Sequence, residues 1–169
     1  MNEPELYSEA VPFKLARPIV GVFVVLSLMF LGMFIYQMEG GSLGGKPAPD
    51  WYYLVMFVVF VAFTLLMFNF DKLKILVTFS SITVGYGRFK RVMSWEDISD
   101  CYADESSVFS YGGYGIRTGR VNGKSRLVYN VLGGERVVLA LKKGRFNEFV
   151  FSTNDPDAVM NVIKQRIRE

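Results

Sequence analysis

Two stretches of the chain contain only uncharged, mostly apolar residues, and they follow each other closely. They cover residues 18–38 and residues 51–70. Each is about 20 residues long, which is the length that an α-helix needs to cross about 30 Å of hydrocarbon. A buried helix of a soluble protein normally keeps a polar stripe, and neither stretch has one. The pattern therefore predicts two transmembrane helices.

The connection between these stretches, residues 39–50, is short and rich in glycine and proline, which favours a turn. A helical hairpin over residues 18–70 is therefore expected. A signal peptide is the alternative for the first stretch, but its apolar core is longer than usual and no cleavage site of small residues follows it. Amphipathic rings near the turn are expected at the level of the lipid headgroups: Tyr36, Trp51, Tyr52 and Tyr53.

Basic residues near the two stretches indicate an orientation. Lysine and arginine accumulate on the cytoplasmic side of membrane proteins. Most of the flanking cations lie outside the hairpin, which predicts a multi-pass protein of the cell (inner, cytoplasmic) membrane with both termini in the cytoplasm. The outer flanks hold Lys14, Arg17, Lys72 and Lys74, whereas the loop holds Lys46.

After residue 70 the pattern changes to short runs of β-branched and aromatic residues bounded by glycine and polar residues, which indicates about seven short strands. Two positions read as tight hairpin turns, Gly133-Gly134 and Lys143-Gly144. The segments with this pattern, from which about seven strands are expected, are residues 74–80, 82–87, 88–95, 95–103, 115–119, 126–132, 136–142 and 146–152.

The last segment returns to helical spacing. Asp155 suits the N-cap of a helix, and Pro156 suits its first turn. Apolar residues then recur on one face, so this helix is expected to cap one end of a bent sheet or open barrel. The predicted organisation is a cytoplasmic segment (1–17), a transmembrane hairpin (18–70) and a mainly-β cytoplasmic domain (71–169).

Several short motifs mark the segment after the hairpin. They are W-E-D-I (95–98), Y-G-G-Y-G-I-R (111–117), Y-N-V (129–131), G-G (133–134) and D-P-D (155–157). Together they resemble the prokaryotic PH-like (bacterial pleckstrin-homology) domain proteins, in which a helical hairpin is a common companion. The resemblance covers residues 73–168 and implies a split barrel capped by a C-terminal α-helix. It implies no agreed ligand, and Tyr114 stands where members often have tryptophan.

Charge is divided unevenly along the chain, whose net charge is +3. Residues 71–169 hold 16 Lys/Arg and 11 Asp/Glu, whereas residues 1–70 hold 3 Lys/Arg and 5 Asp/Glu. A basic domain beside a membrane is attracted by anionic lipids. The excess is too small to indicate a nucleic-acid partner.

The residue types needed for catalysis are scarce. The chain has no histidine, which removes the usual general base and the commonest metal ligand. The single cysteine, Cys101, has no histidine partner and is expected to be a buried apolar thiol. No ionisable residue lies in either apolar stretch, which argues against transport by the hairpin alone. We expect no catalytic residues, no cofactor and no metal.

Basic and aromatic residues are the candidates for contacts with lipid or a partner. The glycines of residues 111–117 could expose backbone N–H groups to an anion, but the spacing matches no phosphate-binding motif, and a loop with positive φ angles is the simpler interpretation. The candidates are Arg88, Lys90, Arg91, Tyr111, Tyr114, Arg117, Arg120, Lys124 and Arg126.

These features predict a membrane-anchored, non-enzymatic interaction or scaffold module. Its expected partners are the lipid bilayer and either another protein, as in an accessory subunit of a membrane complex, or a second copy of the chain. The alternative is a module that binds anionic lipid headgroups. An enzyme or a transporter component has the least support.

Overall fold

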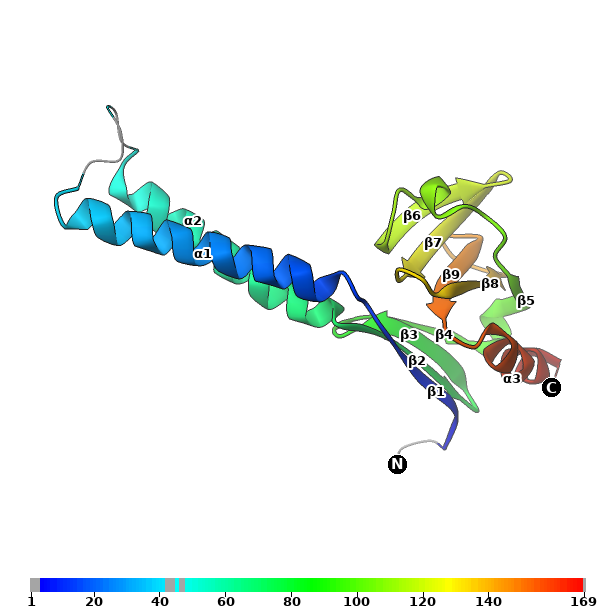
Figure 1. The fold of residues 1–169 in the computed structure, drawn as a ribbon. Helices are drawn as coiled ribbons and strands as arrows, with labels where there is room; N and C mark the ends of the chain where they lie inside the picture. Colours follow the sequence, from blue (N-terminus) through cyan, green and yellow to red (C-terminus); the bar gives the residue numbers. More distant parts are fainter. Residues whose placement is uncertain (1–3, 42–44, 46–47, 169) are drawn as a thin grey trace. The chain divides into compact units, whose positions relative to one another are not determined.

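The computed structural model describes residues 4–41, 45 and 48–168, and the chain forms two compact units. One unit is Leu15–Asn69, and the other combines Met1–Lys14 with Phe70–Glu169. Figure 1 shows the first as a pair of helices and the second as two sheets with a helix. Lys46, which was used to infer the orientation, lies outside the described residues.

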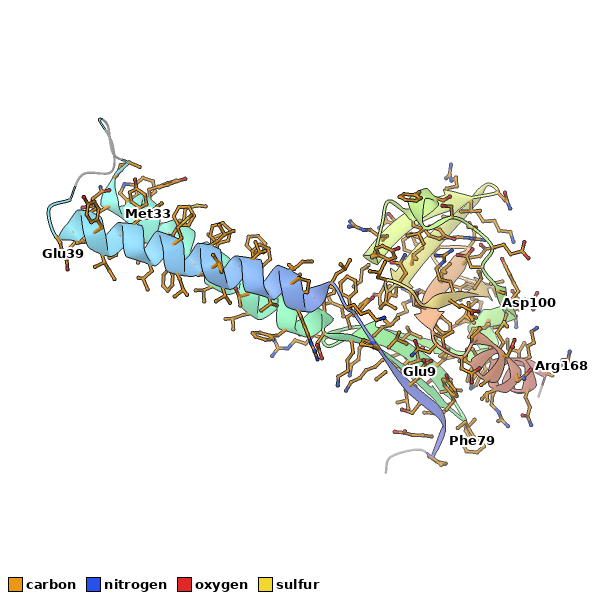
Figure 2. The ribbon with its side chains drawn as sticks, in the orientation of Figure 1. Glu9, Met33, Glu39, Phe79, Asp100 and Arg168 are labelled. Carbon is orange, nitrogen blue, oxygen red and sulfur yellow. The ribbon has the colours of Figure 1, made fainter. Side chains whose placement is uncertain are left out.

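The helical unit contains α1 (Ala16–Met38) and α2 (Asp50–Met67), and the 3₁₀ turn η1 (Phe68–Phe70) follows α2. Both helices are long and apolar enough to cross a membrane. Their side chains are carbon along almost the whole length (Figure 2) and are largely exposed, with Val25 at 65%. Water disfavours such exposed apolar surface, whereas lipid accepts it. The prediction of two long apolar helices is confirmed.

The two helices contact each other through aromatic rings. The ring of Phe23 lies 5.6 Å from that of Phe63, and the ring of Phe30 lies 5.5 Å from that of Phe60. Near the end of α1, the side-chain nitrogen of Gln37 donates to the carbonyl oxygen of Ala48 at 2.8 Å. These contacts confirm the helical hairpin.

The first sheet has four antiparallel strands in the order β1-β2-β3-β4. No strand was expected within residues 1–17, yet β1 pairs with β2 and buries Val11 against Leu73. The hairpin is thus inserted between two neighbouring strands, because β1 ends at Pro12 and its partner Lys72 begins β2. The bounds are β1 (Glu5–Pro12), β2 (Lys72–Thr78), β3 (Ser81–Tyr86) and β4 (Phe89–Ser94).

The second sheet has five strands in the order β5-β8-β9-β7-β6. The strands on either side of Lys143-Gly144, β8 and β9, are antiparallel neighbours as expected, but residues 142–147 join them as a longer loop rather than a tight turn. The bounds are β5 (Ile98–Ala103), β6 (Gly115–Val121), β7 (Lys124–Asn130), β8 (Glu135–Leu141) and β9 (Glu148–Thr153).

The prediction of a hairpin turn at Gly133-Gly134 is wrong. β7 and β8 are not neighbours, because β9 lies between them and runs parallel to β7. The glycine pair instead lets the chain cross the end of β9. A β-carbon on Gly134 would lie 3.0 Å from the side chain of Ser152, whose hydroxyl already accepts a hydrogen bond from the Val131 amide.

The inner faces of the two sheets form the main core. Tyr86 of β3 is fully buried, and its hydroxyl donates to the carbonyl oxygen of Asn130 at the end of β7 at 2.6 Å. The rings of Tyr86 and Tyr129 lie 6.2 Å apart, which brings the two sheets together.

The C-terminal helix α3 (Pro156–Arg168) packs against β5 and β8. The carboxylate of Asp155 accepts a hydrogen bond from the amide of Ala158 at 3.0 Å, so the predicted N-cap is confirmed. Val159 and Ile163 are fully buried. A β-rich region of two sheets capped by a C-terminal helix is therefore present.

Candidate functional site

The face of the five-stranded sheet opposite the main core carries five charged residues, which we call the charged cluster. They come from β7, β8 and β9 and from the residue that follows β5. The side chains of its two acids are only 1% exposed, and that of its central arginine is 6% exposed. The charged cluster comprises Asp104, Lys124, Arg126, Arg136 and Glu148.

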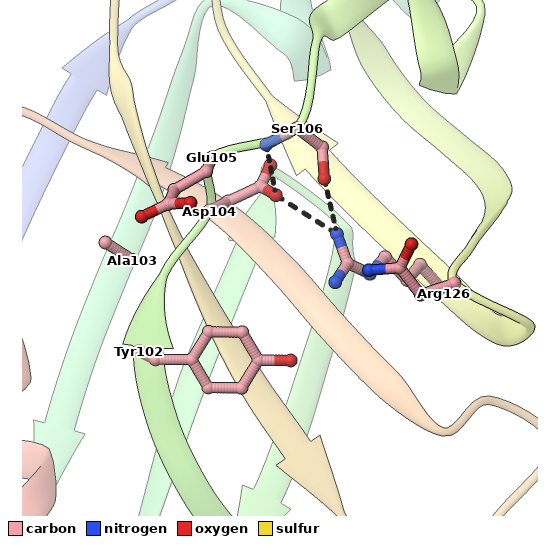
Figure 3. Close-up of a pocket in the computed structure, with 7 residues that line it drawn as sticks. Tyr102, Ala103, Asp104, Glu105, Ser106 and Arg126 are labelled. Atoms are coloured by element: carbon pink, nitrogen blue, oxygen red, sulfur yellow. Dashed lines mark hydrogen bonds and ion pairs between the residues drawn. The ribbon is translucent and has the colours of Figure 1, made fainter.

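Each buried carboxylate of the charged cluster meets two cations. Asp104 lies 3.0 Å from Nη1 of Arg126 and 2.7 Å from Nε of Arg136. Glu148 lies 2.8 Å from Nζ of Lys124 and also binds Nε of Arg126. Figure 3 shows the guanidinium of Arg126 pointing toward Asp104. Such pairing offsets the large cost of removing charges from water.

Two tyrosines complete the hydrogen bonds of this network. The hydroxyl of Tyr111 donates to Asp104 at 3.1 Å and accepts from Nη1 of Arg126 at 2.6 Å. The hydroxyl of Tyr102 donates to Glu148 at 2.8 Å. Buried polar networks stabilise one conformation when their members are satisfied, as here.

The hydrogen bonds of the network favour the ionised form of its two acids. Burial raises the pKa of Asp104, but hydrogen bonds from Arg136 and Ser106 outweigh it, and the net pKa is lowered. The pKa of Glu148 is lowered in the same way, because hydrogen bonds from Lys124, Tyr102 and Arg126 exceed the effect of burial. Both acids are therefore ionised at neutral pH, and the charged cluster carries a net positive charge.

The charged cluster fastens one segment over the sheet, residues 104–114, which we call the covering segment. Its turn η3 (Val108–Tyr111) places the Tyr111 ring on a small core of Val128, Val138 and Val150. Tyr111 is 3% exposed. The covering segment is thus held at Asp104 by arginines and at Tyr111 by both apolar and polar contacts.

Phe109 lies at the tip of the covering segment and is 92% exposed. Its backbone is fixed on both sides, because its amide donates to the hydroxyl of Ser107 at 3.3 Å and its carbonyl accepts from the amide of Gly112 at 3.1 Å. A large apolar ring is therefore presented to solvent by a hydrogen-bonded turn.

The glycine-rich part of the covering segment adopts the backbone that the simpler interpretation required. Gly112, Gly113 and Gly115 have φ angles of 72°, 110° and 95°. These are left-handed conformations that favour glycine. The side chain of Asn130 donates to the carbonyl of Gly113, and Nε of Arg117 donates to the carbonyl of Tyr114, both at 3.1 Å.

The candidate residues of the sequence fall on different surfaces. Lys124 and Arg126 belong to the charged cluster, and Tyr111 is hydrogen-bonded to Arg126. Arg117 and Arg120 are both exposed, but they point to opposite faces of β6, because side chains alternate along a strand. Tyr114 is half-buried in the covering segment.

The expected basic group of Arg88, Lys90 and Arg91 is also divided. Arg88 lies in the turn between β3 and β4, whereas Lys90 and Arg91 are successive residues of β4 and point to opposite faces. The guanidinium of Arg91 reaches toward Gly144, between the sheets. Lys90 instead faces outward, beside Lys74, as described below.

Sequence reasoning missed several residues of this site. Glu148 had a signal, because it is an ionisable residue within an otherwise apolar strand and such residues need partners. Asp104 and Arg136 carried no comparable signal, since the ion pairs of Asp104 with Arg126 and Arg136 join residues more than 20 positions apart. Phe109 could not be singled out, because a phenylalanine near a turn is more often buried.

Cys101 is buried in β5, as expected. Burial raises the pKa of its thiol to about 12, so the thiol is protonated at neutral pH and is a poor nucleophile. In the part of the chain that the structure describes, no three side chains of histidine, cysteine, aspartate or glutamate gather as a metal site.

Two exposed apolar helices, two β-sheets and a C-terminal helix define the class of this protein. Comparisons of the chain with protein-family models, with curated proteins and with solved structures find no match. The functional argument therefore rests on the geometry of the chain itself.

Proposed function

We propose that this protein is a membrane-anchored, non-enzymatic interaction module whose β-rich unit recruits a protein partner through the covering segment. The hairpin supplies the attachment to the membrane, and Phe109 supplies the principal contact. The partner would present an apolar pocket that accepts one aromatic ring.

Anchoring is supported by the hairpin and by the strand pairing around it. α1 and α2 expose apolar side chains along their length, as lipid-facing helices do. Because β1 precedes the hairpin and β2 follows it, their hydrogen bonds require both ends of the hairpin to lie on one side of a membrane that both helices cross. We propose the cytoplasmic side, on the basis of Lys14, Arg17, Lys72 and Lys74.

The exposure of Phe109 is the observation that carries the proposal. Burying a phenylalanine side chain stabilises by about 1.5–3 kcal/mol, and here the ring is left in water. Interfaces draw most of their affinity from a few rigid anchors, often aromatic, that fill pockets on the partner. A pre-ordered turn adds to affinity because little conformational entropy is lost on binding.

We further propose that the β-rich unit is a PH-like domain. The division into two sheets and the C-terminal helix support this assignment. The W-E-D-I motif falls on the turn η2 (Trp95–Asp97) and the start of β5, and Y-G-G-Y-G-I-R leads into β6. The parallel pairing of β7 with β9 and the additional strand β1 were not expected from the resemblance.

Photocrosslinking in intact cells tests the proposal. A benzophenone amino acid replaces Phe109, and a matched variant carries it at Thr118, an exposed residue of β6. We expect a discrete adduct from position 109 that is absent from position 118. Mass spectrometry of the adduct, together with two differently tagged copies of the chain, separates a foreign partner from self-association.

The substitution Phe109→Ser supplies the second test. It should abolish co-purification of the crosslinked partner in mild detergent and leave the melting temperature unchanged, because the ring has almost no contacts within the chain. Equal adducts from both positions, or unchanged co-purification of the Phe109→Ser protein, would contradict the proposal.

A further inference from the structure

A separate surface lies on the outer face of the four-stranded sheet. It is a depression of about 580 Å³ lined from β1, β2 and β4, which we call the lysine pocket. Three exposed lysines line it, Lys72, Lys74 and Lys90. It does not include Phe109 or any residue of the charged cluster.

The strand register brings two of these lysines toward one another. Lys74 of β2 pairs with Gly85 of β3, and Gly85 pairs with Lys90 of β4. The two lysines are therefore two strand spacings apart, roughly 10 Å at the backbone. Gly85 has no side chain to separate them, and the stem of Lys90 lies over it, 2.9 Å from where a β-carbon would stand.

The lysine pocket carries a net positive charge, because more lysines than carboxylates line it. The ion pairs within the described residues use Lys124, Arg126 and Arg136 as cations, and none uses a lysine of this pocket. Two carboxylates also line the pocket. Glu9 is engaged by Thr153 and Asn154 of the other sheet, and Glu5 lies exposed at the edge.

Covalent connection places this charge beside the apolar helices. Lys72 is two residues beyond Phe70, where the last helical turn after α2 ends. Two residues span at most about 7 Å, so Lys72 stays close to the end of the hairpin in every arrangement of the two units. With the hairpin anchored in a membrane as proposed, this end lies near the lipid headgroups, where anionic lipids attract lysines.

We propose that the lysine pocket binds a phosphate-bearing anion, with the phosphate held between the ammonium groups of Lys74 and Lys90 and Lys72 beside it. The chemistry fits the headgroup of an anionic phospholipid and also a small soluble phosphate. This site goes beyond the proposed function, because it lies on the other sheet and does not depend on Phe109.

Binding is tested with the purified full chain in a neutral detergent. Short-chain phosphatidylglycerol, short-chain phosphatidylcholine and glycerol phosphate are titrated, and the melting temperature and native mass spectra are followed. We expect saturable binding of phosphatidylglycerol and weaker binding of phosphatidylcholine, whose choline cation is repelled by the lysines. Binding of glycerol phosphate at equal concentration would support the phosphate site and assign it to a soluble ligand.

A charge-matched pair of variants decides whether the pocket is specific. K72A/K74A/K90A removes three cations from the lysine pocket, and K142A/K143A/K164A removes three exposed cations elsewhere. The first should weaken phosphatidylglycerol binding at least tenfold, since each lysine contributes about 1 kcal/mol, and the second should change it less than threefold.

A variant that keeps the three positive charges of the lysine pocket is the control for folding. K72R/K74R/K90R should bind within about threefold of the original chain, because arginine also binds phosphate. Equal losses in the two alanine variants, or no saturable binding of any phosphate compound to the original chain, would overturn the proposal.

Discussion

At the scale of single residues, Arg126 is the centre of the charged cluster. It contacts both buried acids and the hydroxyl of Tyr111. Burial lowers its pKa, but hydrogen bonds with Tyr111 and Glu148 exceed that effect and raise the net pKa, so the guanidinium stays charged. Arg126 therefore helps to hold the covering segment, and with it Phe109, together with Arg136 and the apolar contacts of Tyr111.

Replacing Arg126 by methionine should destabilise the β-rich unit by about 3–5 kcal/mol, because Asp104 and Glu148 would lose their shared cation while remaining buried. Thermal unfolding of the full chain in detergent measures the loss. Arg120→Met is the matched control, since Arg120 is exposed, and should change stability by less than about 0.5 kcal/mol. Similar melting temperatures for the two variants would contradict the role of the network.

The charged cluster also predicts a dependence on acid. The pKa values of Asp104 and Glu148 are lowered in the folded chain, so their contribution is fully present above their unfolded pKa values, near pH 4. It is lost as the pH falls through the folded pKa values. The melting temperature should therefore fall steeply below about pH 4.

Asp104→Asn should make that acid dependence shallower, because one of the two responsible carboxylates is gone. Glu105→Gln is the matched control, since Glu105 is the next residue and is exposed. Melting curves between pH 7 and pH 3 for both variants provide the measurement. An identical slope for Asp104→Asn and the original chain would refute the assignment to this network.

At the scale of elements, β1 links the two sheets. Glu9 of β1 accepts hydrogen bonds from the hydroxyl of Thr153, from the amide of Asn154 at 2.8 Å and from the hydroxyl of Tyr7 at 2.8 Å. Among the described strands, β1 pairs with β2 alone, because it lies at the edge of its sheet. The carboxylate of Glu9 therefore decides how firmly β1 is attached to β9.

Glu9→Ala should destabilise the β-rich unit by about 2 kcal/mol, because hydrogen bonds to a charged group are among the stronger ones. Amide hydrogen exchange should accelerate in β1 more than in β3. Glu5→Ala changes a carboxylate at the exposed end of the same strand and should leave both measurements unaltered. Unchanged exchange in β1 of the Glu9→Ala protein would show that Glu9 does not hold the strand.

At the scale of the whole molecule, the pairing of β1 with β2 makes the two ends of the hairpin one folded unit. A hydrogen-bonded strand pair cannot form across a bilayer. The segment between β1 and β2 must therefore cross a membrane an even number of times. This conclusion does not depend on counting cations. The side on which the unit lies does depend on them.

Labelling of single introduced cysteines in sealed cells tests this topology. Gly45→Cys, in the loop, should react with an impermeant maleimide from outside, whereas Glu5→Cys and Thr118→Cys should react only after permeabilisation. The original chain serves as the unlabelled control, because its single cysteine, Cys101, is buried. Different accessibility of positions 5 and 118 would contradict the common side, and a reversed pattern would contradict the cytoplasmic orientation.

Elements that depend on neighbouring residues were predictable from the sequence. The apolar helices follow from uninterrupted hydrophobic runs, and α3 follows from the Asp155 cap and its apolar face. Most strands of the second unit follow from short β-branched runs. Each of these signals lies within a few residues of the element it specifies, so no partner needs to be known.

Only the tertiary structure decided the features that join distant residues. β1 forms because β2, about 65 residues later, offers an edge, and β9 enters between β7 and β8, which follow each other in the sequence. The partners of Arg126 and the separation of Lys90 from Arg91 depend on which strands meet and which face is buried. Local sequence patterns do not specify those pairings, because the hydrogen bonds and ion pairs between strands join residues that are far apart in the sequence.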